Sequence, residues 1–419
     1  MNGEAVVATK RGAIDFHWPI FGEEEVEALK EVVEGGRWGH AAPEGYVGRF
    51  EPAFERDFAD FHTARSGLCV ANGTVALQLA LEALDIGYGD EVIVPGLTWQ
   101  ATAAAVLDVN AVPILADVEP DTYCLDPAAV EAAITPRTRA VIAVHLYNSL
   151  ADLDRLAELC ASRGVHLLED CAHSHGSAWK GRGVGSVGAI GCFSFQSSKS
   201  LTCGEGGFVM TSDSLLAERL DSLRNCGRRP AWAGDDWAPI QSGNYRLSEW
   251  QAAILSTQFA RFPGQLELRA ANAAKLDAAF AEIRGLTPMR RRAEMTRHGL
   301  YAYVIRYDES AFSGLSAAAF RAALQETTSV PIGSTYEPLD RSPLYQPLTK
   351  RRYRISEQWR AIDPRRFDLG VANWAYEHEA VVIPHEVLLA PWDEVSKLVE
   401  AAGEISAHAH ELAARSAGA

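Results

Sequence analysis

The chain has 419 residues, a length typical of one large and one smaller domain, and enough apolar side chains (47%) for a substantial core. Its net charge of −16 argues against a nucleic acid or an anionic membrane as a partner, although a local basic pocket could still hold a small anion. No stretch is apolar enough to predict a membrane span, and the first residues lack the apolar run of a secretory signal.

Seven cysteines are scattered through the chain, and most of them lie in apolar runs. Their odd number and the lack of a Cys-x-x-Cys pair in the sequence indicate reduced, buried thiols rather than disulfides or a zinc ribbon. Together these features predict a cytoplasmic protein.

Predicted strands and helices alternate from about residue 68 onward. Apolar runs of strand length lie at residues 91–95, 112–116, 140–145, 165–169, 189–194 and 207–210. Helical patterns lie between them at residues 74–84, 99–109, 126–133 and 152–163. Strands that read as continuous apolar runs between helices are typical of a mostly parallel sheet covered on both faces. This part of the chain is therefore predicted to be an α/β domain.

The rest of the chain follows another pattern. A long helical stretch at about 248–283 leads to an alternating, strand-like run at 301–307 and a helix at 317–326. We predict a first domain of residues 1–265, with the N-terminal segment and the large α/β domain. A second domain of residues 266–419 would contain the linker helix and a small α+β domain.

Residues 183–188, Gly-Val-Gly-Ser-Val-Gly, match the G-x-G-x-x-G fingerprint of dinucleotide-binding proteins. That fingerprint binds a dinucleotide where it follows a strand and opens a helix. Here a polar turn precedes the glycines and a strand follows them, so we interpret the motif as a glycine-rich loop without a nucleotide.

Lys199 lies between a short apolar strand and the glycine-rich turn Gly204-Glu-Gly-Gly207. Glycine permits close backbone approach, and burial in such a loop would lower the pKa of the amine, so that a neutral amine could attack a carbonyl. A lone lysine in a hairpin is more often an ordinary surface residue. Its significance therefore depends on residues elsewhere in the chain.

Two further features support a site around Lys199. Asp170 ends a predicted strand, and open α/β sheets bind their ligands beyond the carboxyl ends of the strands. Gly73 and Thr74 open a predicted helix, whose free amides and dipole favour an anion. Asp170 alone is more often a helix cap. An amine, a carboxylate and an anion site together, however, are what pyridoxal phosphate (PLP) requires.

With these residues in place, the chain resembles the DegT/DnrJ/StrS family of PLP-dependent aminotransferases, which act on ketosugars and ketocyclitols. The resemblance covers residues 18 to about 389 and rests on ordered motifs. The motifs are Asn72-Gly-Thr-Val-Ala-Leu77, Asp90-Glu-Val-Ile-Val-Pro95, Glu169-Asp-Cys-Ala-His173, Phe193-Ser-Phe-Gln-Ser-Ser-Lys199, Gly204-Glu-Gly-Gly207 and Gly243-Asn-Tyr-Arg246. The resemblance implies an aspartate-aminotransferase-like fold (fold type I) with PLP as cofactor.

The resemblance also implies roles for individual residues. Lys199 would form the Schiff base with the cofactor and then carry the proton between substrate and cofactor. Asp170 would bind the pyridine nitrogen and keep it protonated. The other implied cofactor contacts are Trp99, which would stack on the ring, His173, and the phosphate-site residues Gly73, Thr74, Ser194 and Asn244. Because Asn244 matches a position that reaches the phosphate from a neighbouring subunit, a homodimer with shared active sites is expected.

The sequence departs from the family pattern at His173, where glutamine is common; histidine could still bond the 3-oxygen of the cofactor. Lys199 is retained, which favours amino transfer over the dehydratase activity of relatives that carry histidine there. No metal is predicted. The residues that could suggest one, His166, Asp170, Cys171, His173 and His175, alternate between the faces of a strand.

The residues around Lys199 look most like the family branch that aminates ketocyclitols such as scyllo-inosose or 2-deoxy-scyllo-inosose in aminoglycoside biosynthesis. The expected partners are therefore a ketone acceptor and an amino-acid donor, L-glutamine or L-glutamate. A nucleotide-ketosugar aminotransferase is the nearer alternative, and a non-catalytic PLP-fold partner protein is another. His298 and Tyr301 are candidate substrate contacts on family grounds alone.

Residues 350–366 hold seven basic side chains in seventeen positions. A solvated face or charge pairing between subunits is the ordinary interpretation. The alternative hypothesis is that one of these arginines pairs with the α-carboxylate of the amino donor.

Overall fold

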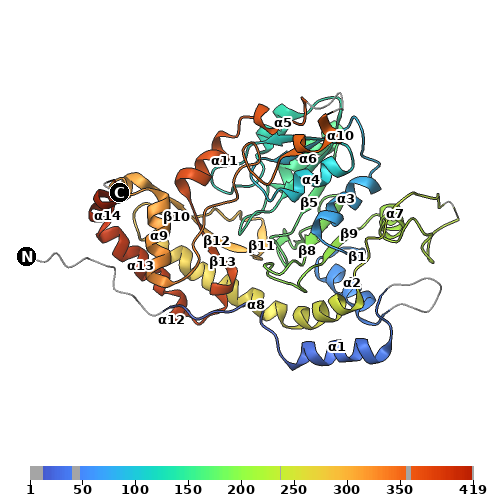
Figure 1. Ribbon diagram of the computed structural model, residues 1–419, viewed down its shortest axis with the longest axis horizontal. Helices are drawn as coiled ribbons and strands as arrows, with labels where there is room; N and C mark the ends of the chain where they lie inside the picture. The colour runs from blue at the N-terminus through green and yellow to red at the C-terminus, as the bar shows by residue number, and fades with distance from the viewer. Residues whose placement is uncertain (1–12, 40–47, 236, 355–359, 418–419) are drawn as a thin grey trace, which may run out of the picture.

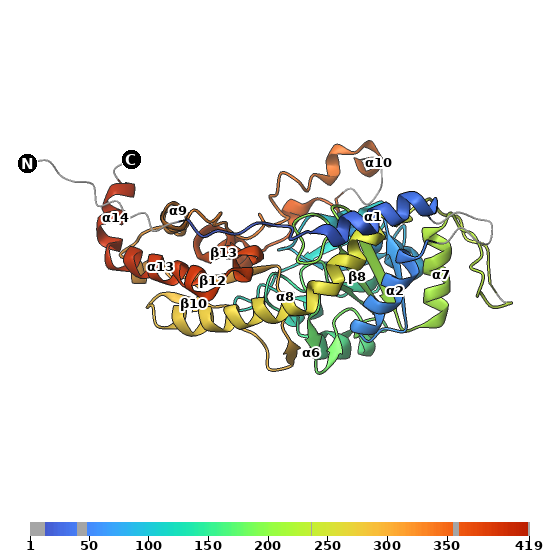
Figure 2. The same ribbon diagram turned by 90° about the horizontal axis from the view of Figure 1, so that it is seen from below.

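The computed structural model describes residues 13–39, 48–235, 237–354 and 360–417. The chain forms a larger and a smaller lobe, and the long helix α8 (Glu249–Ala281) runs along both (Figure 1). The view from below shows that the molecule is elongated, with the small lobe at one end (Figure 2).

A seven-stranded sheet forms the centre of the large lobe, in the order β1-β9-β8-β5-β4-β2-β3. Its strands are β1 (Ser66–Val70), β2 (Glu91–Pro95), β3 (Val112–Ala116), β4 (Thr138–Val144), β5 (His166–Asp170), β8 (Ile190–Ser194) and β9 (Gly207–Thr211). Strand β9 runs antiparallel to both of its neighbours, β1 and β8, and the other adjacent strands of this sheet pair in parallel. The predicted mostly parallel sheet is therefore confirmed, and each of its six predicted strands is present.

The sequence patterns did not predict the edge strand β1. It begins with Ser66 and Gly67, two residues with weak strand preference, and only three apolar residues follow them. Gly67 is required by its surroundings, because a Cβ at this position would collide with the ring of Phe208 on β9. Pairing with β9, a contact between distant parts of the chain, forms this strand.

Helices lie between the strands of the large lobe. They are α3 (Gly73–Ala83), α4 (Ala101–Asp108), α5 (Pro127–Ala133), α6 (Leu153–Arg163) and α7 (Ser214–Arg224). The first four correspond to the four predicted helices. Each of α3, α5, α6 and α7 begins with an Asn or Asp side chain that accepts a first-turn amide hydrogen.

Aromatic packing fixes helix α2 (Phe50–Phe61) against the strands that flank the Lys199 loop. The ring of Phe58 lies edge-on to Phe193 of β8 and to Phe208 of β9, with centroid distances of 5.1 and 4.9 Å. Phe54 contacts Phe195 in the same way at 5.4 Å. These five rings are buried, so the base of the loop that carries Lys199 rests on a rigid apolar layer.

Helix α8 follows the predicted stretch 248–283 closely and has 33 residues. A capping box starts it: the amide of Ser248 donates to the side chain of Gln251 at 3.1 Å. Its buried side chains begin in the large-lobe core and continue into the small-lobe core, from Ala252 to Phe280. The helix therefore supports both lobes.

The small lobe contains an antiparallel sheet in the order β10-β12-β13. Its strands are β10 (Leu286–Pro288), β12 (Ala302–Tyr307) and β13 (Ala380–Pro384), and its helices are α9 (Ala317–Thr328), α12 (Trp392–Val395), α13 (Lys397–Ala407) and α14 (Ala409–Ala417). The predicted strand and helix of this region correspond to β12 and α9. A separate apolar core joins them, and Ile14 from the N-terminal segment belongs to it.

The chain between the two parts of the small lobe returns to the large lobe. It carries α10 (Arg351–Arg354) and α11 (Gly370–Trp374), and its buried side chains Leu339, Tyr345 and Leu369 belong to the large-lobe core. The predicted domain boundary at residue 265 falls inside α8, and we retain it as a proposal.

The remaining elements are α1 (Glu23–Gly35) and a small sheet of β11 (Met295–Arg297), β6 (Ala178–Trp179) and β7 (Arg182–Gly183). Of the seven cysteines, five are buried, Cys203 is half-buried and Cys226 is exposed, and all are free thiols. Among the described residues, no helix is both long and apolar enough to cross a bilayer.

The glycine motif at residues 183–188 binds an anion inside the protein. The amides of Gly185, Val187 and Gly188 donate to the carboxylate of Glu169 at 2.8, 2.9 and 2.6 Å. His145 contacts the same carboxylate at 3.1 Å, and Glu169 is fully buried. These contacts occupy the amides that a dinucleotide phosphate would need, and β7 rather than a helix adjoins the glycines. Both observations agree with the interpretation as a loop without nucleotide.

Candidate active site

A cavity of about 680 Å³ opens at the carboxyl ends of the parallel strands. It brings together residues from β5, β8, the loop after β8, and the first turns of α3 and α4. The predicted residues that line it are Gly73, Thr74, Trp99, Asp170, His173, Ser194, Lys199 and Tyr301. Eight of the ten residues singled out from the sequence therefore share one cavity.

Lys199 lies in a tight turn between β8 and β9 and is 8% exposed. Its amide donates to the carbonyl of Gln196 at 2.8 Å, which closes the turn. Burial lowers the pKa of its ammonium group to about 8, although the attraction of Asp170 opposes this shift. A substantial fraction of the amine is therefore neutral near pH 8, as a nucleophilic lysine requires.

Asp170 ends β5 and is 7% exposed. The amide of Ala172 donates to one carboxylate oxygen at 3.1 Å, and the hydroxyl of Thr102 donates to the other at 2.9 Å. Burial raises the pKa of Asp170, while both hydrogen bonds and the charge of Lys199 oppose the rise. The carboxylate is thus arranged to receive a cationic partner from the cavity.

The first turn of α3 provides the anion site. The first amides of a helix have no carbonyl partner within it. The side chain of Asn72 accepts the amide of Val75 at 3.0 Å, and the amides of Gly73 and Thr74 are the ones available to an anion. A Cβ on Gly73 would lie 2.7 Å from the Cβ of Ser194. Glycine is therefore needed for the close approach of β8 that places the Ser194 hydroxyl at this helix end.

His173 lies in the cavity wall among three tyrosines. Its Nδ1 accepts the amide of Tyr147 at 3.4 Å, and its Nε2 lies 3.1 Å from the hydroxyl of Tyr336. Burial and the nearby Lys199 charge hold its pKa well below the usual range, so the ring is neutral. An amide only donates, so the ring proton lies on Nε2 and is donated to Tyr336. The expected bond from His173 to a cofactor oxygen stays a prediction.

Tyr301 lies between the histidine and the lysine. Its ring stacks on His173 with centroids 3.9 Å apart, and the Nζ of Lys199 lies 4.4 Å from its ring centre. Its hydroxyl lies 3.0 Å from the hydroxyl of Ser198. Tyr301 therefore contacts the reactive lysine, in addition to being a candidate substrate contact.

Trp99 lies at the rim of the cavity and is 45% exposed. Its ring is 5.4 Å from that of Tyr336 and tilted by 56° to it. The predicted stacking of Trp99 on a cofactor ring remains a prediction.

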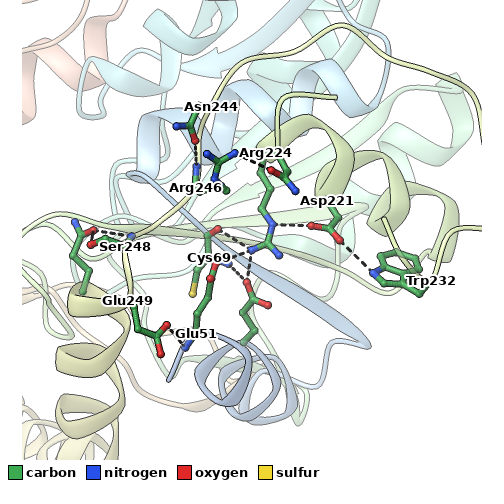
Figure 3. Close-up of polar contacts among 12 residues, drawn as sticks. Glu51, Cys69, Asp221, Arg224, Trp232, Asn244, Arg246, Ser248 and Glu249 are labelled. Carbon is green, nitrogen blue, oxygen red and sulfur yellow. Dashed lines mark hydrogen bonds and ion pairs between the residues drawn. The ribbon is translucent and has the colours of Figure 1, made fainter. Parts of the chain in front are cut away.

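Two predicted site residues lie outside this cavity. His298 does not line it, and the charges of Arg291 and Asp277 act on its ring instead. Asn244 is exposed on an extended segment beyond α7, where its side-chain oxygen accepts the amide of Arg246 at 3.4 Å (Figure 3). The predicted phosphate contact of Asn244 would therefore have to be made in another copy of the chain.

A buried arginine anchors the segment that carries Asn244. The amide of Tyr245, next to Asn244, donates to the carbonyl of Arg224 at 2.9 Å. The Arg224 guanidinium pairs with Asp221 at 2.8 Å and with Glu51 and Glu55, so it ties α7 to α2 (Figure 3). Arg224 is 4% exposed. The segment around Asn244 is therefore held on a rigid base.

The basic stretch at 350–366 lies partly outside the described residues, because positions 355–359 are not described. Within the described part, Arg352 and Lys350 pair with Asp108, and Arg365 pairs with Asp363 at 2.7 Å. The Arg352–Asp108 distance is also 2.7 Å. The proposed pairing of one of these arginines with a donor carboxylate remains a prediction.

Sequence reasoning missed several residues of the cavity: Thr98, Thr102, Gln196, Ser198, Glu205 and Tyr336. Thr102 lies in the first turn of α4, three positions after Trp99, and Gln196 and Ser198 lie within three positions of Lys199. Their closeness in sequence to Trp99 and Lys199 could have indicated that these three residues line the site. Tyr336 offered none, because it comes from the irregular segment that returns to the large lobe.

The residues present fit PLP in chemical type. The cavity offers an amine of lowered pKa, a buried carboxylate for a ring nitrogen, and helix amides with a hydroxyl for a phosphate. Lys199, Asp170 and the Gly73–Ser194 cradle would hold the aldehyde, ring and phosphate ends respectively. When bound, PLP supplies an electron sink for the pair left on a substrate carbon after proton removal.

One group of possible metal ligands occurs in the described part of the chain, and none of its residues lines the cavity. One ligand atom each of His145, Glu169 and Cys171 lies within 4.8 Å of the others, and all three are buried. Glu169 already receives three amides and His145, so its oxygens are bound within the protein.

The comparisons with known proteins agree with this site. The profile of the DegT/DnrJ/EryC1/StrS aminotransferase family matches residues 19–365. The chain is 40% identical to the L-glutamine:scyllo-inosose aminotransferase of Streptomyces griseus, covering 94% of this chain and 95% of that protein. It is 39% identical to the L-glutamine:2-deoxy-scyllo-inosose aminotransferase of Streptomyces kanamyceticus, covering 95% of each. The structure of 3-amino-5-hydroxybenzoic acid synthase matches with a TM-score of 0.80 and 32% identity, covering 95% of this chain and all of that one.

Proposed function

Because the chain belongs to the DegT/DnrJ/EryC1/StrS family of PLP-dependent aminotransferases, which act on sugars or cyclitols, we propose that its acceptor is a ketocyclitol and its donor L-glutamine. The ketone would be scyllo-inosose or its 2-deoxy form, and the product would serve aminocyclitol antibiotic biosynthesis. The observation that carries the proposal is the similarity, over nearly the whole chain, to two relatives that share this donor and this acceptor class.

The charge of the cavity also supports a neutral acceptor. Among the described residues that line it, Lys199 is the only lysine or arginine, whereas Asp108, Asp170 and Glu205 are acidic. A nucleotide diphosphate is usually bound by arginine or lysine side chains. A cyclitol carries only hydroxyls, and hydroxyls of Tyr301, Tyr336 and Ser198 line the cavity to meet them.

The proposed reaction uses residues of the chain in distinct roles. Lys199 would take the proton from the donor carbon at its Nζ and pass it on to the cofactor, which is possible because burial brings the pKa of its amine to about 8. Asp170, fixed by Thr102 and Ala172, keeps the ring nitrogen cationic. Tyr301, whose ring contacts the Nζ of Lys199, would block movement of the amine toward that ring.

The proposal includes a homodimer with shared active sites. Asn244 is exposed and lies outside the cavity of its own chain, on a segment held by the buried Arg224. Contribution of this side chain to the phosphate site of a second copy would give it the role implied by the family motif. Each site would then be incomplete in a monomer.

A substrate panel tests the proposal. The purified enzyme with PLP is incubated with L-glutamine or L-glutamate and with scyllo-inosose, 2-deoxy-scyllo-inosose or ketosugar nucleotides, and the aminated product is identified by mass spectrometry. Amination of a ketocyclitol with L-glutamine is expected. Amination of only the nucleotide-linked ketones would favour the alternative acceptor class.

The alternative that this chain is a non-catalytic PLP-fold partner protein is tested by the cofactor absorbance in the same incubations. Such a protein would bind PLP but keep its visible absorbance when L-glutamine or L-glutamate is added. An active aminotransferase is expected to lose that absorbance as the amino group is transferred to the cofactor.

A further inference from the structure

Three ring N–H groups bind backbone carbonyls shortly before Lys199, one at the end of β8 and two in the turn that follows. The Nε2 of His175 lies 2.8 Å from the carbonyl of Ser194, the Nε1 of Trp18 donates to Ser197 at 2.9 Å, and the Nε2 of His385 lies 3.0 Å from the carbonyl of Ser198. We propose that Trp18 and His385 are positioning residues that hold the Lys199 amine at the cavity. This inference rests on the reactive role proposed for Lys199.

The loop needs such support because little regular structure holds it. The amide of Phe195 pairs with the carbonyl of Gly206 at 2.8 Å, and beyond this pair the chain leaves the sheet. The carbonyls of Ser197 and Ser198 lie in the following turn. A lysine side chain is flexible, so the position of its Nζ depends first on where the backbone is fixed.

His385 follows β13 on the small lobe and is 1% exposed. Its imidazole is neutral, because burial and the nearby Arg269 charge hold its pKa well below the usual range. A carbonyl only accepts hydrogen bonds, so the single ring proton lies on Nε2 and is donated to Ser198. The bond therefore acts across the working pH range, and it joins the small lobe directly to the residue before Lys199.

Trp18 lies on the N-terminal segment, and its ring packs between two groups. It meets the ring of His385 edge-on at 4.9 Å, and the guanidinium carbon of Arg269 lies 5.2 Å from its centre. Arg269 is 1% exposed, and its guanidinium nitrogens have no hydrogen-bond acceptor among the described residues. Arg269, which belongs to α8, therefore lies against the Trp18 ring and fixes the indole under the loop.

The segment that carries Trp18 is itself attached at two points. The amide of Ile14 donates to Thr328 of the small lobe at 3.3 Å. The carbonyl of Ile20 accepts Gln258 and Arg261 of α8 at 2.8 and 2.9 Å. Figure 2 shows this segment crossing from the small lobe to α1 alongside α8. The lysine loop of the large lobe is therefore held by the small lobe, the segment and α8 together.

Substitutions at His385 test the hydrogen bond separately from packing. His385→Gln keeps a side-chain amide N–H near the position of Nε2, whereas His385→Met fills similar space without a donor. On the PLP-loaded enzyme, we measure the pH midpoint of the visible cofactor absorbance and the rate at which L-glutamine bleaches it. His385→Met is expected to displace the midpoint and to slow bleaching by at least about tenfold, as small misplacements of a reactive group do. His385→Gln is expected to restore most of both.

Trp18→Phe gives a second test at a half-buried position, because it removes the N–H and keeps an aromatic ring; it is expected to change both readouts in the direction of His385→Met. Trp179→Phe is the matched control. It also removes an indole N–H, which donates to Asp154 at 2.9 Å, and neither residue lines the cavity. Native values in both His385→Met and Trp18→Phe would overturn the proposal, as would equal losses in His385→Met and His385→Gln. A Lys199→Ala variant that L-glutamine still bleached would instead overturn the role proposed for Lys199.

Discussion

The hydroxyl of Thr102 donates a hydrogen bond of 2.9 Å to the Oδ2 of Asp170. The hydroxyl of Thr98 lies 3.0 Å from that of Thr102, so the start of α4 and the residues just before it direct a short chain of hydroxyls toward this carboxylate. The bond favours the ionised form of Asp170 in a place where burial raises its pKa. Asp170 must be negatively charged to keep a cofactor ring nitrogen protonated. Thr102, 68 positions away in the sequence, therefore helps to maintain that charge.

Replacing Thr102 tests this dependence. Thr102→Val removes the hydroxyl and keeps the shape, and hydrogen bonds to charged groups contribute about 1.5–3 kcal/mol, so PLP affinity should fall at least about tenfold. The dissociation constant is measured by titration of the cofactor absorbance. Thr102→Ser should retain near-native affinity. Equal affinity of the Val variant and the native protein would exclude this role for Thr102.

The lowered pKa of Lys199 predicts how the apoenzyme captures PLP. Only the neutral amine attacks the aldehyde, so the rate of covalent capture should rise with pH and level off above about 8. A lysine in solvent would show a rate that climbs toward pH 10.4. Stopped-flow absorbance measures the rate, and Lys199→Arg should show no capture. A rate that still climbs above pH 9 would contradict the burial of this amine.

Gly73→Ala should weaken the phosphate site without unfolding the protein. The new Cβ would lie 2.7 Å from the Cβ of Ser194 and 3.2 Å from its Cα, so β8 or the start of α3 must shift. We expect loss of bound cofactor on dialysis. Gly264→Ala on α8 is the control, because its Cβ would meet no atom of the described residues within 4 Å. It should keep the cofactor and gain up to about 1 kcal/mol of stability from helix propensity.

His62 predicts acid sensitivity of the fold. Its ring is fully buried, contacts the carbonyl of Val184 through Nδ1 at 2.9 Å and accepts the amide of Gly176 at 3.2 Å. Burial lowers the pKa of His62 to about 3, against about 6.5 when unfolded. The unfolded chain therefore binds the proton first, and stability should fall as the pH drops from about 6.5 toward 3, by up to about 5 kcal/mol from this group.

Denaturant unfolding at several pH values measures this effect. His62→Asn keeps a donor for the Val184 carbonyl but does not titrate, so it should be less stable at neutral pH and lose less stability on acidification. His410→Asn, at an exposed position, should show the native slope. Parallel slopes for native protein and His62→Asn would disprove the assignment to His62.

Mixing two inactive variants tests the shared active site. If Asn244 acts in a second copy, Lys199→Ala and Asn244→Ala should each be inactive or strongly impaired. A refolded mixture should regain up to about a quarter of native activity, because one site in each mixed dimer is complete. Two variants that each lose activity but never complement would place Asn244 outside the shared site. Size-exclusion chromatography of each variant checks that dimers still form.

The sequence determined the order of elements and the chemistry of the site. Continuous apolar runs predicted six of the seven strands of the central sheet, because fully buried strands leave a local pattern. Asp170 and Gly73 were recognisable because they stand at a strand end and a helix start, and Lys199 because it lies between a strand and a glycine-rich turn. Edge strand β1 was missed because its pairing, rather than its composition, forms it.

The tertiary structure alone decided which groups hold these residues. The G-x-G-x-x-G loop binds Glu169, Tyr336 reaches His173, and Trp18 and His385 reach the Lys199 loop across 179 and 187 positions of sequence. Such contacts have no periodicity and no fixed spacing, since they form only when separate elements pack around one core. A local pattern can thus identify a reactive lysine, whereas the position of its amine depends on how the whole chain closes around it.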